Sequence, residues 1–533
     1  MPLTKKIILS VVVTLILVGS SLGLILFLKS TSFSLDSWGV LDDEGFPGLY
    51  LSFSCSGTVT VKVIGPDSSI LDSDFYFKGD HNTILHLAEY RHIVTPGQYD
   101  LKAYDNNDKE IFLKTFSFGA LDLAILSCEQ KWWERDPWVG GYSLLGLRMT
   151  VQNNGDTPVY PYNVTVVMDS EEINSRILPC VITSGDSEYV DCFIYRKTIP
   201  DDSTFTVSLE DIDKNTLAIN SFSVDVENNV PVKKFSWQYN GHRQPNVPNS
   251  EYLYNYYSSL ERIVDEDYGL YIFDPYDDQY IDILIDCIMF GFTSSNDVEK
   301  INYIASFVQN LEYKSDDDSN SSFEYPRYPI ETLFNNGGGG DCEDKAILTA
   351  SLLYGLGYDV ALLRLPDHMA VGVHLSEDAI PDKEYYVENY YFLETTTPIK
   401  PCGFIPSQYT GSSSDVTVYP ISSRALLTHN WEDNSLTIYT NTEMGDLVKV
   451  ILYVENLGIE TANNVKVIGG FYKISDLKVV SKSQTISSLD PGMKKKVTLS
   501  VNIPKSVVTW FKTRIYYNYE IVDERESSAS FPT

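Results

Sequence analysis

The sequence predicts a multidomain protein in which one α+β domain lies between all-β sandwich modules, behind an N-terminal transmembrane helix. Three observations lead to this prediction. The first is an apolar, charge-free run at the N-terminus, and the second is a recurring pattern of short β-rich runs separated by turns. The third is a run of glycines followed by one long apolar helix. With 533 residues, the chain is too long for a single hydrophobic core.

The first predicted element is a membrane anchor at residues 7–28. Ile7 to Leu28 contains no charged residue, and a helix of this length spans about 33 Å, enough to cross a hydrocarbon core of roughly 30 Å. A cleaved signal peptide is the alternative, but the apolar run is long for one and no small-residue cleavage site follows. Because Lys5 and Lys6 precede the run, we expect a cytoplasmic N-terminus. The protein is then a single-pass protein of the cell membrane, with the bulk of the chain extracellular.

The charge balance restricts the partners of the protein. Against 40 Lys and Arg residues stand 73 Asp and Glu residues, a formal net charge of −33. Such a surface repels nucleic acid and anionic lipid, so we expect no nucleic-acid partner and a membrane contact through the N-terminal helix alone. Salt adaptation and cation binding both remain compatible with the acidity. The acidic run Asp316 to Asp318 fits either a Ca²⁺ loop or a solvated loop.

Three β-sandwich modules are predicted, at residues 33–120, 121–227 and 430–533. The last two share an internal repeat, since the segment 149–155 and the segment 452–458 have similar sequences and each precedes another β-rich run. The later unit resembles the CARDB-type immunoglobulin-like modules of prokaryotic surface proteins. That resemblance implies spacing or adhesion, and a fold of this kind does not fix a function.

A cluster of tryptophans in the second module allows two interpretations. Trp132, Trp133 and Trp138 form either a platform on which a carbohydrate stacks or part of a hydrophobic core. Contact with a glycan therefore stays open.

Between the second and third modules, residues 228–248 are polar and contain prolines, which predicts a linker, and residues 249–425 form the α+β domain. Helices are expected over 250–290 and 294–311. Four glycines at 337–340 then end one structure, and a helix with Cys342 in its first turn begins another. We expect Asp341 to cap this helix, with the carboxylate of Asp344 returning to it.

The position of Cys342 has chemical meaning. Unpaired N–H groups and the helix dipole at a helix N-terminus favour a thiolate, although Asp341, Glu343 and Asp344 oppose it by charge repulsion. Activation then needs a cationic partner. His368 begins a β-rich run whose small residues on the same face allow close approach to a helix, and Glu394 lies near the end of a later strand.

A known family shows this arrangement. The similar segments are Pro329 to Leu333, Gly340 to Val360, His368 to Val373 and Tyr391 to Thr396. They resemble the archaeal and bacterial branch of the transglutaminase-like cysteine peptidase superfamily, which has a papain-like fold. By position the resemblance implies Cys342 as nucleophile, His368 as general base and acid, and Glu394 as the group that orients the imidazole. Gln309 would offer its amide to an oxyanion. Many members have Asp where this chain has Glu394, so its backbone must lie about one methylene further away.

These residues predict a thiol enzyme that acts on amide or peptide bonds of a protein or peptide substrate at the cell surface, through a thioester acyl-enzyme. Water as the acceptor gives a cysteine protease, which we expect because an amine must outcompete water. An amine as the acceptor gives a transglutaminase. A non-catalytic adhesive or structural surface protein is the third alternative.

We expect no cofactor and no metal in this site. A metal centre built from Cys342, His368 and His374 is disfavoured, because six residues of strand separate the two histidines by about 20 Å. The other six of the seven cysteines allow disulfides in an oxidising compartment. We expect a cross-strand disulfide between Cys180 and Cys192, and a buried thiol at Cys287.

Overall fold

The computed structural model describes residues 31–135, 141–260, 262, 268–316, 324–376, 379–380, 386–407, 409, 416–422, 424–431, 436–442 and 445–531. The expected membrane helix at residues 7–28 lies outside these ranges. Within them, no helix is long and apolar enough to cross a membrane. Contacts between residues divide the chain into two compact units. The first comprises the chain up to Asp122 with Asn153–Tyr160 and Val181–Asp186, and the second comprises the rest.

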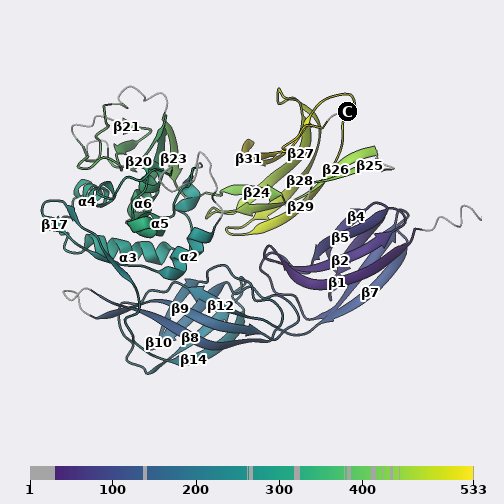
Figure 1. The fold of residues 1–533 in the computed structure, drawn as a ribbon, viewed down its shortest axis with the longest axis horizontal. Helices are drawn as coiled ribbons and strands as arrows, with labels where there is room; N and C mark the ends of the chain where they lie inside the picture. The colour runs from purple at the N-terminus through teal and green to yellow at the C-terminus, as the bar shows by residue number, and fades with distance from the viewer. Residues whose placement is uncertain are drawn as a thin grey trace, which may run out of the picture. The chain divides into compact units, whose positions relative to one another are not determined.

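The first unit contains two antiparallel sheets that form a β-sandwich (Figure 1). One sheet has the order β1-β2-β5, with β1 at Phe33–Asp43, β2 at Phe46–Cys55 and β5 at Gly79–His86. The other has the order β4-β3-β6-β7, with β4 at Ile70–Tyr76, β3 at Val59–Ile64, β6 at Gly97–Asp105 and β7 at Glu110–Phe118. Alternate residues of both sheets, such as Leu51 and Val61, are fully buried in one core. This is the period of two expected of half-buried strands.

The second module also forms two antiparallel sheets. One sheet has the order β12-β9-β8, with β12 at Ser187–Cys192, β9 at Tyr142–Asn153 and β8 at Leu123–Glu134. The other has the order β11-β10-β13-β14, with β11 at Glu171–Arg176, β10 at Asn163–Met168, β13 at Thr204–Glu210 and β14 at Thr216–Ser223. Trp132 is fully buried and Trp133 is nearly so, which confirms the core interpretation for these two residues. Trp138 lies outside the described residues.

The C-terminal module is again a pair of sheets. In one, β26 (Gly445–Asn456) pairs with β24 (Leu427–Trp431), β25 (Thr437–Thr442) and β29 (Lys494–Asn502). The other has the order β28-β27-β30-β31, with β28 at Lys478–Leu489, β27 at Ala462–Tyr472, β30 at Trp510–Tyr517 and β31 at Glu520–Glu526. The prediction of a multidomain protein rich in β-sandwich sheets is therefore confirmed.

The internal repeat extends to hydrogen bonds. Asn153 ends β9 and Asn456 ends β26, and both are fully buried. In each, the amide N–H groups donate to two backbone carbonyls and the amide oxygen accepts from a glycine N–H two residues later. The partners are Thr157, Ile182 and Gly155 for Asn153, and Glu460, Leu489 and Gly458 for Asn456. In each of the two modules, the asparagine at the corresponding position therefore closes a turn with the same set of hydrogen bonds.

The α+β domain is built around one helix, α6 (Cys342–Gly355), whose residues from Glu343 to Leu353 are buried. A helix that is apolar on all sides belongs in a protein interior. It packs against α3 (Asp278–Met289), α4 (Asp297–Gln309), α5 (Pro329–Phe334) and the strands β19 (Val360–Leu365) and β20 (His368–His374). The sheet has the order β21-β22-β20-β19-β23, with β21 at Tyr386–Val387, β22 at Tyr390–Leu393 and β23 at Thr417–Ile421 (Figure 1).

Several local expectations differ from the structure. The helix expected over 250–290 is broken into α2 (Glu251–Ser259), a short 3-10 turn at Tyr268–Tyr271 and α3. The expected linker at 228–248 forms two short antiparallel pairs, β15 (Val232–Lys234) with β18 (Asn246–Pro248) and β16 (Trp237–Gln238) with β17 (His242–Arg243). Trp237 and Val247 from this segment are buried in the core of the α+β domain. The polar composition of residues 228–248 predicted a linker, but the apolar residues spaced within this segment indicated that part of it is buried.

The expected disulfide between Cys180 and Cys192 is wrong, since all seven cysteines are thiols in the structure. Cys192 is buried in the sheet, where its strand partner is Leu147 of β9, and Cys180 is only partly buried. The backbone of Cys192 forms a bridge with Ile177, three residues before Cys180. The pairing that the turn suggested is therefore out of register by three residues.

Candidate functional site

Cys342 is presented by a glycine loop at the start of α6. Gly337, Gly338 and Gly339 have positive φ values of 88°, 83° and 116°, a region that other residues rarely adopt. A Cβ on Gly339 would collide with the carbonyl oxygen of Glu312. The helix then begins as predicted, because the N–H of Asp341 donates to Oδ2 of Asp344 at 3.3 Å.

The thiol of Cys342 is held in its protonated form. Its Sγ donates to Oε2 of Glu343 at 3.2 Å. Burial is the largest influence and raises the pKa of Cys342, and the charge and hydrogen bond of Glu343 raise it further. The backbone N–H of Met369 acts in the opposite direction without reversing the shift. The neighbouring acid and burial, rather than the helix dipole, therefore decide the resting protonation state.

Through Met369, the strand β20 lies next to Cys342. Met369, whose backbone lies close enough to the thiol of Cys342 to lower its pKa, directly follows His368, the first residue of β20. The helix α6 packs on this strand through the face opposite to the one expected. Met369, Val371 and Val373 share a core with the helix, whereas Ala370 packs in a separate core on the other face of the sheet. The structure thus carries Cys342 and His368 on adjoining ends of two packed elements.

His368 and Glu394 form a buried pair. Nε2 of His368 lies 3.2 Å from Oε2 of Glu394, and the two side chains are 6% and 1% exposed. β20 and β22 are neighbours in the sheet, and Glu394 directly follows the last residue of β22. The other oxygen, Oε1, accepts from the N–H of Thr396 at 2.8 Å, from the N–H of Thr397 at 3.2 Å and from the hydroxyl of Thr396.

These bonds keep Glu394 ionised. Burial alone would raise its pKa, but the hydrogen bonds from His368 and Thr396 and the charge of His368 outweigh burial and lower the pKa of Glu394 to about 2. The ring of Tyr409 stacks on the imidazole of His368, with centroids 4.7 Å apart and planes at 4°. A carboxylate on one edge and an aromatic ring on one face fix the imidazole.

Gln309 has a different position from the one expected. Its Nε2 donates to the carbonyl oxygens of Glu394 and Lys400, both at 2.8 Å, and its Oε1 accepts from the N–H of Lys400 at 3.4 Å. Gln309 is 2% exposed. Both N–H bonds of the amide are used within the fold, so an oxyanion role does not follow from this geometry. Gln309 instead holds the loop that carries Glu394.

A group of buried charged residues surrounds the start of α6. Arg327 donates to Oδ1 of Asp316 at 2.9 Å and pairs with Asp344. Burial raises the pKa of Asp344 to about 8 despite Arg327, and burial together with neighbouring acids raises the pKa of Glu343 to about 10. Lys345 is fully buried and donates to a backbone carbonyl, and burial lowers its pKa to about 8.

Sequence reasoning missed some of these residues. The threonines that follow Glu394 directly, as Thr395, Thr396 and Thr397, were a readable signal, because hydroxyl and N–H donors one to three residues away bind a carboxylate locally. Tyr409 and Arg327 reach the site from distant sequence positions and gave no such signal. His374 lies at the far end of β20 and faces Asp359 at 3.6 Å, away from the candidate site, as the strand geometry predicted.

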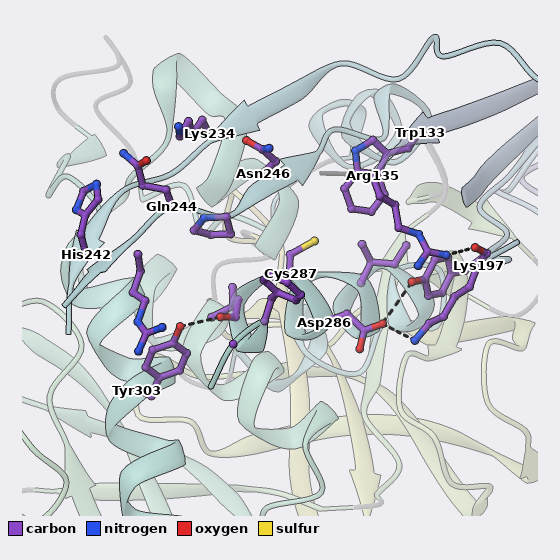
Figure 2. A pocket seen from close by; sticks show the side chains of 17 residues that line it. Trp133, Arg135, Lys197, Lys234, His242, Gln244, Asn246, Asp286, Cys287 and Tyr303 are labelled. Carbon is purple, nitrogen blue, oxygen red and sulfur yellow. Dashed lines mark hydrogen bonds and ion pairs between the residues drawn. The ribbon is translucent and has the colours of Figure 1, made fainter. Parts of the chain in front are cut away.

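A separate cavity of about 600 Å³ lies in the second unit (Figure 2). Its lining includes the basic residues Arg135, Lys197, Lys234 and Arg243, and one acid, Asp286, which pairs with Lys197 at 2.6 Å. Cys287 also lines it, but burial raises the pKa of this thiol to about 12. None of Cys342, His368 and Glu394 lines the cavity, so it is not where we place thiol chemistry.

Comparisons with known proteins do not identify a fold or a function for this chain. No family profile and no curated protein matches the chain. Among solved structures, the chain aligns with a GH2 β-galacturonidase from Eisenbergiella tayi bound to galacturonate at 10% identity and a TM-score of 0.15, covering 39% of this chain and 45% of that one. The YadV chaperone aligns at 10% identity and a TM-score of 0.13, covering 36% and 99%. The exo-chitosanase CsxA of Amycolatopsis orientalis aligns at 9% identity and a TM-score of 0.14, covering 90% and 76%. Scores this low support neither a shared fold nor a shared function.

Proposed function

We propose that this protein is a thiol enzyme of the transglutaminase-like, papain-like kind, which cleaves amide or peptide bonds through Cys342, His368 and Glu394. The observation that carries the proposal is the 3.2 Å contact between Nε2 of His368 and Oε2 of Glu394. His368 begins β20, which packs on the helix that starts at Cys342, and Glu394 directly follows the neighbouring strand β22. A thiol nucleophile needs a base held in place by a third group. Buried ionisable pairs of this kind are costly, and they are found preferentially at functional sites.

The proposed reaction uses the two ring nitrogens of His368 differently. Nε2 is engaged by Glu394, so Nδ1 is the nitrogen that accepts the proton of the Cys342 thiol. The thiolate attacks the amide carbonyl carbon, a C–S bond forms, and the oxyanion is stabilised by the N–H of Cys342. The C–N bond then breaks, and His368 returns the proton to the leaving amine.

Water completes the cycle. It attacks the thioester while His368 removes its proton, a carboxylic acid leaves, and the thiol of Cys342 is restored. Glu394, with its pKa near 2, stays ionised throughout and stabilises the imidazolium. We favour water over an amine as the acceptor, since an amine must outcompete it. A cysteine protease is therefore the first form of the proposal, and a transglutaminase is the second.

The proposal also places the enzyme at the cell surface. The charge-free run at residues 7–28 would anchor it in the membrane, with the bulk of the chain on the extracellular side. Mass spectrometry of the N-terminal peptide from the membrane fraction tests this part. A mature N-terminus beginning after Leu28 would contradict it.

A second candidate is a surface protein whose thiol domain binds without turnover. The observation in its favour is the raised pKa of Cys342, which burial and Glu343 produce. In an active enzyme, substrate binding must allow His368 to take the thiol proton; in a binding protein, no such step occurs.

Substrate profiling of the full-length protein with a peptide library, read by mass spectrometry, distinguishes the two. We expect cleavage by the wild type, none by Cys342→Ala, and normal cleavage by Cys287→Ala as a matched thiol control. Peptidyl electrophiles should label Cys342 in the wild type and should do so much more slowly in His368→Ala. If the wild type cleaves nothing and Cys342 stays unlabelled, the binding protein is the better description.

A further inference from the structure

We propose that Asp316, Asp341 and Glu343 form a binding site for a divalent cation of the Ca²⁺ class beside Cys342. One carboxylate oxygen from each of the three residues lies within 4.8 Å of the others. The three side chains come from two segments, since Asp316 follows α4 and the other two flank the first residue of α6. All three residues are more than nine-tenths buried, at 8%, 9% and 4% exposure.

Two oxygens in this cluster have no donor. Oδ1 of Asp341 and Oε1 of Glu343 are buried and accept no hydrogen bond from any described residue. The carboxylates of these two residues are nevertheless within hydrogen-bonding reach of each other. Two buried acceptors without a donor require a proton or a cation, because a buried acceptor left unsatisfied is costly.

The charge balance favours a cation. Four buried carboxylates meet here, those of Asp316, Asp341, Glu343 and Asp344. Among the described residues, Arg327 is the base that pairs with them, through Asp316 and Asp344. Without a cation, protons on these acids cancel the charge that Arg327 leaves over, and a divalent cation would replace those protons. Buried charges need such compensation.

The ligand set indicates the kind of cation. Carboxylate oxygens without imidazole or thiolate suit a hard cation. Mg²⁺ dehydrates reluctantly and is rarely held by a set of protein carboxylates alone, so the three carboxylates favour the larger Ca²⁺. Asp316 already accepts from Arg327 and from the N–H of Tyr325, which weakens it as a ligand. We therefore expect a dissociation constant of about 0.1–1 mM, as in extracellular calcium modules.

The site would act directly on the contact that holds the thiol. Oε2 of Glu343 accepts the hydrogen bond from Sγ of Cys342 at 3.2 Å, so a cation that binds Glu343 competes with that bond. Binding itself requires no turnover. The inference can therefore fail while the proposed function survives, and the reverse also holds.

Titration calorimetry of the full-length protein with CaCl₂, in about 150 mM KCl to screen its diffuse charge, tests the inference. We expect one saturable site in the wild type and at least about a tenfold loss of affinity in Asp341→Asn and in Glu343→Gln, since each removes a charged ligand. Asp359→Asn, which changes an exposed acid near His374, should bind Ca²⁺ normally. The two neutral variants should retain the secondary structure of the wild type by circular dichroism.

Other outcomes overturn the inference. If no saturable binding is seen up to about 10 mM CaCl₂, the cluster holds a shared proton and no cation. Undiminished binding in the Asp341→Asn, Glu343→Gln double variant would place the cation elsewhere on this acidic chain. A site that takes Mg²⁺ more tightly than Ca²⁺ would contradict the assigned class.

Terbium, which occupies calcium sites and is sensitised by nearby tyrosines such as Tyr325, gives an independent optical readout of binding.

Discussion

Nε2 of His368 lies 3.2 Å from Oε2 of Glu394, while the other oxygen of the same carboxylate accepts from the N–H groups of Thr396 and Thr397. Hydrogen bonds from the turn therefore hold one oxygen of the carboxylate, and the imidazole contacts the other. Glu394 directly follows β22, and these donors lie in the turn after it, so local chain geometry orients its side chain while Gln309 holds its backbone carbonyl.

The first prediction concerns the unit formed by Cys342, His368 and Glu394. Cys342→Ala and His368→Ala should each lower kcat/KM by at least about a thousandfold, and the double variant should be little worse than either. Glu394→Gln should also be severe, a loss of up to about ten-thousandfold, because an amide can hold the ring but cannot stabilise the imidazolium. Steady-state kinetics on a peptide found by profiling checks these values.

His374→Ala is the matched control for the histidine. This residue is half-exposed and pairs with Asp359 at the far end of the strand, so its loss should leave kcat/KM within about twofold of the wild type. Wild-type turnover in a folded Cys342→Ala protein would refute the assignment of the nucleophile. Activity removed by a chelator and restored by Zn²⁺ would refute thiol catalysis as a whole.

The second prediction concerns acid stability. The pKa of Glu394 is lowered from 4.5 to about 2 in the folded protein, so its ionised form stabilises the fold above the unfolded value of 4.5. That stabilisation is lost as the pH falls from about 4.5 towards 2, and it amounts to at most about 3 kcal/mol. Glu394→Gln removes the titration. The difference in the free energy of unfolding between wild type and variant should therefore be largest at neutral pH and shrink near pH 3.

Calorimetric unfolding of both proteins at neutral pH and at about pH 3 measures this difference. Other carboxylates titrate over the same range, but they do so in both proteins and cancel in the comparison. A difference that stays constant with pH would mean that Glu394 gains nothing from its ionised contacts.

The third prediction concerns the glycine loop. Gly339 has a φ of 116°, and a Cβ there would collide with the backbone oxygen of Glu312. Gly339→Ala should therefore destabilise the α+β domain by about 1–3 kcal/mol and shift the start of α6. Gly39→Ala is the control, because no atom lies within 4 Å of its Cβ position and its φ is not in the left-handed region. A melting temperature unchanged in Gly339→Ala would contradict the strain argument.

The elements that the sequence predicted well are those whose signal is local. Alternation gave the sandwich strands, and the sequence from Asp341 to Asp344 gave the cap of α6 that the hydrogen bond from Asp341 to Asp344 confirms. The buried helix α6 was visible from its apolar residues alone. The repeat around Asn153 and Asn456 was also readable, although its hydrogen bonds were not.

The elements that it predicted poorly depend on register and on distant partners. Cys180 and Cys192 flank a turn, but the bridge from Ile177 to Cys192 shows that the chain is paired differently from the hairpin that the turn suggested. The protonation of Cys342 depends on burial and on the direction in which Glu343 points, and neither is a property of sequence spacing. Tyr409 meets His368 only through the tertiary fold.

The last prediction separates two roles for Gln309. As a positioning residue, it donates to the carbonyls of Glu394 and Lys400, so Gln309→Leu would leave two buried acceptors unsatisfied and destabilise the domain by about 1–3 kcal/mol. Activity should fall together with stability, and the pH profile of kcat should change because Glu394 loses its backbone support. As an oxyanion donor, the same variant would lose about a hundredfold in kcat with no loss of stability. Thermal unfolding and kinetics on one preparation decide between the roles, and a stable variant with low kcat would contradict the positioning role.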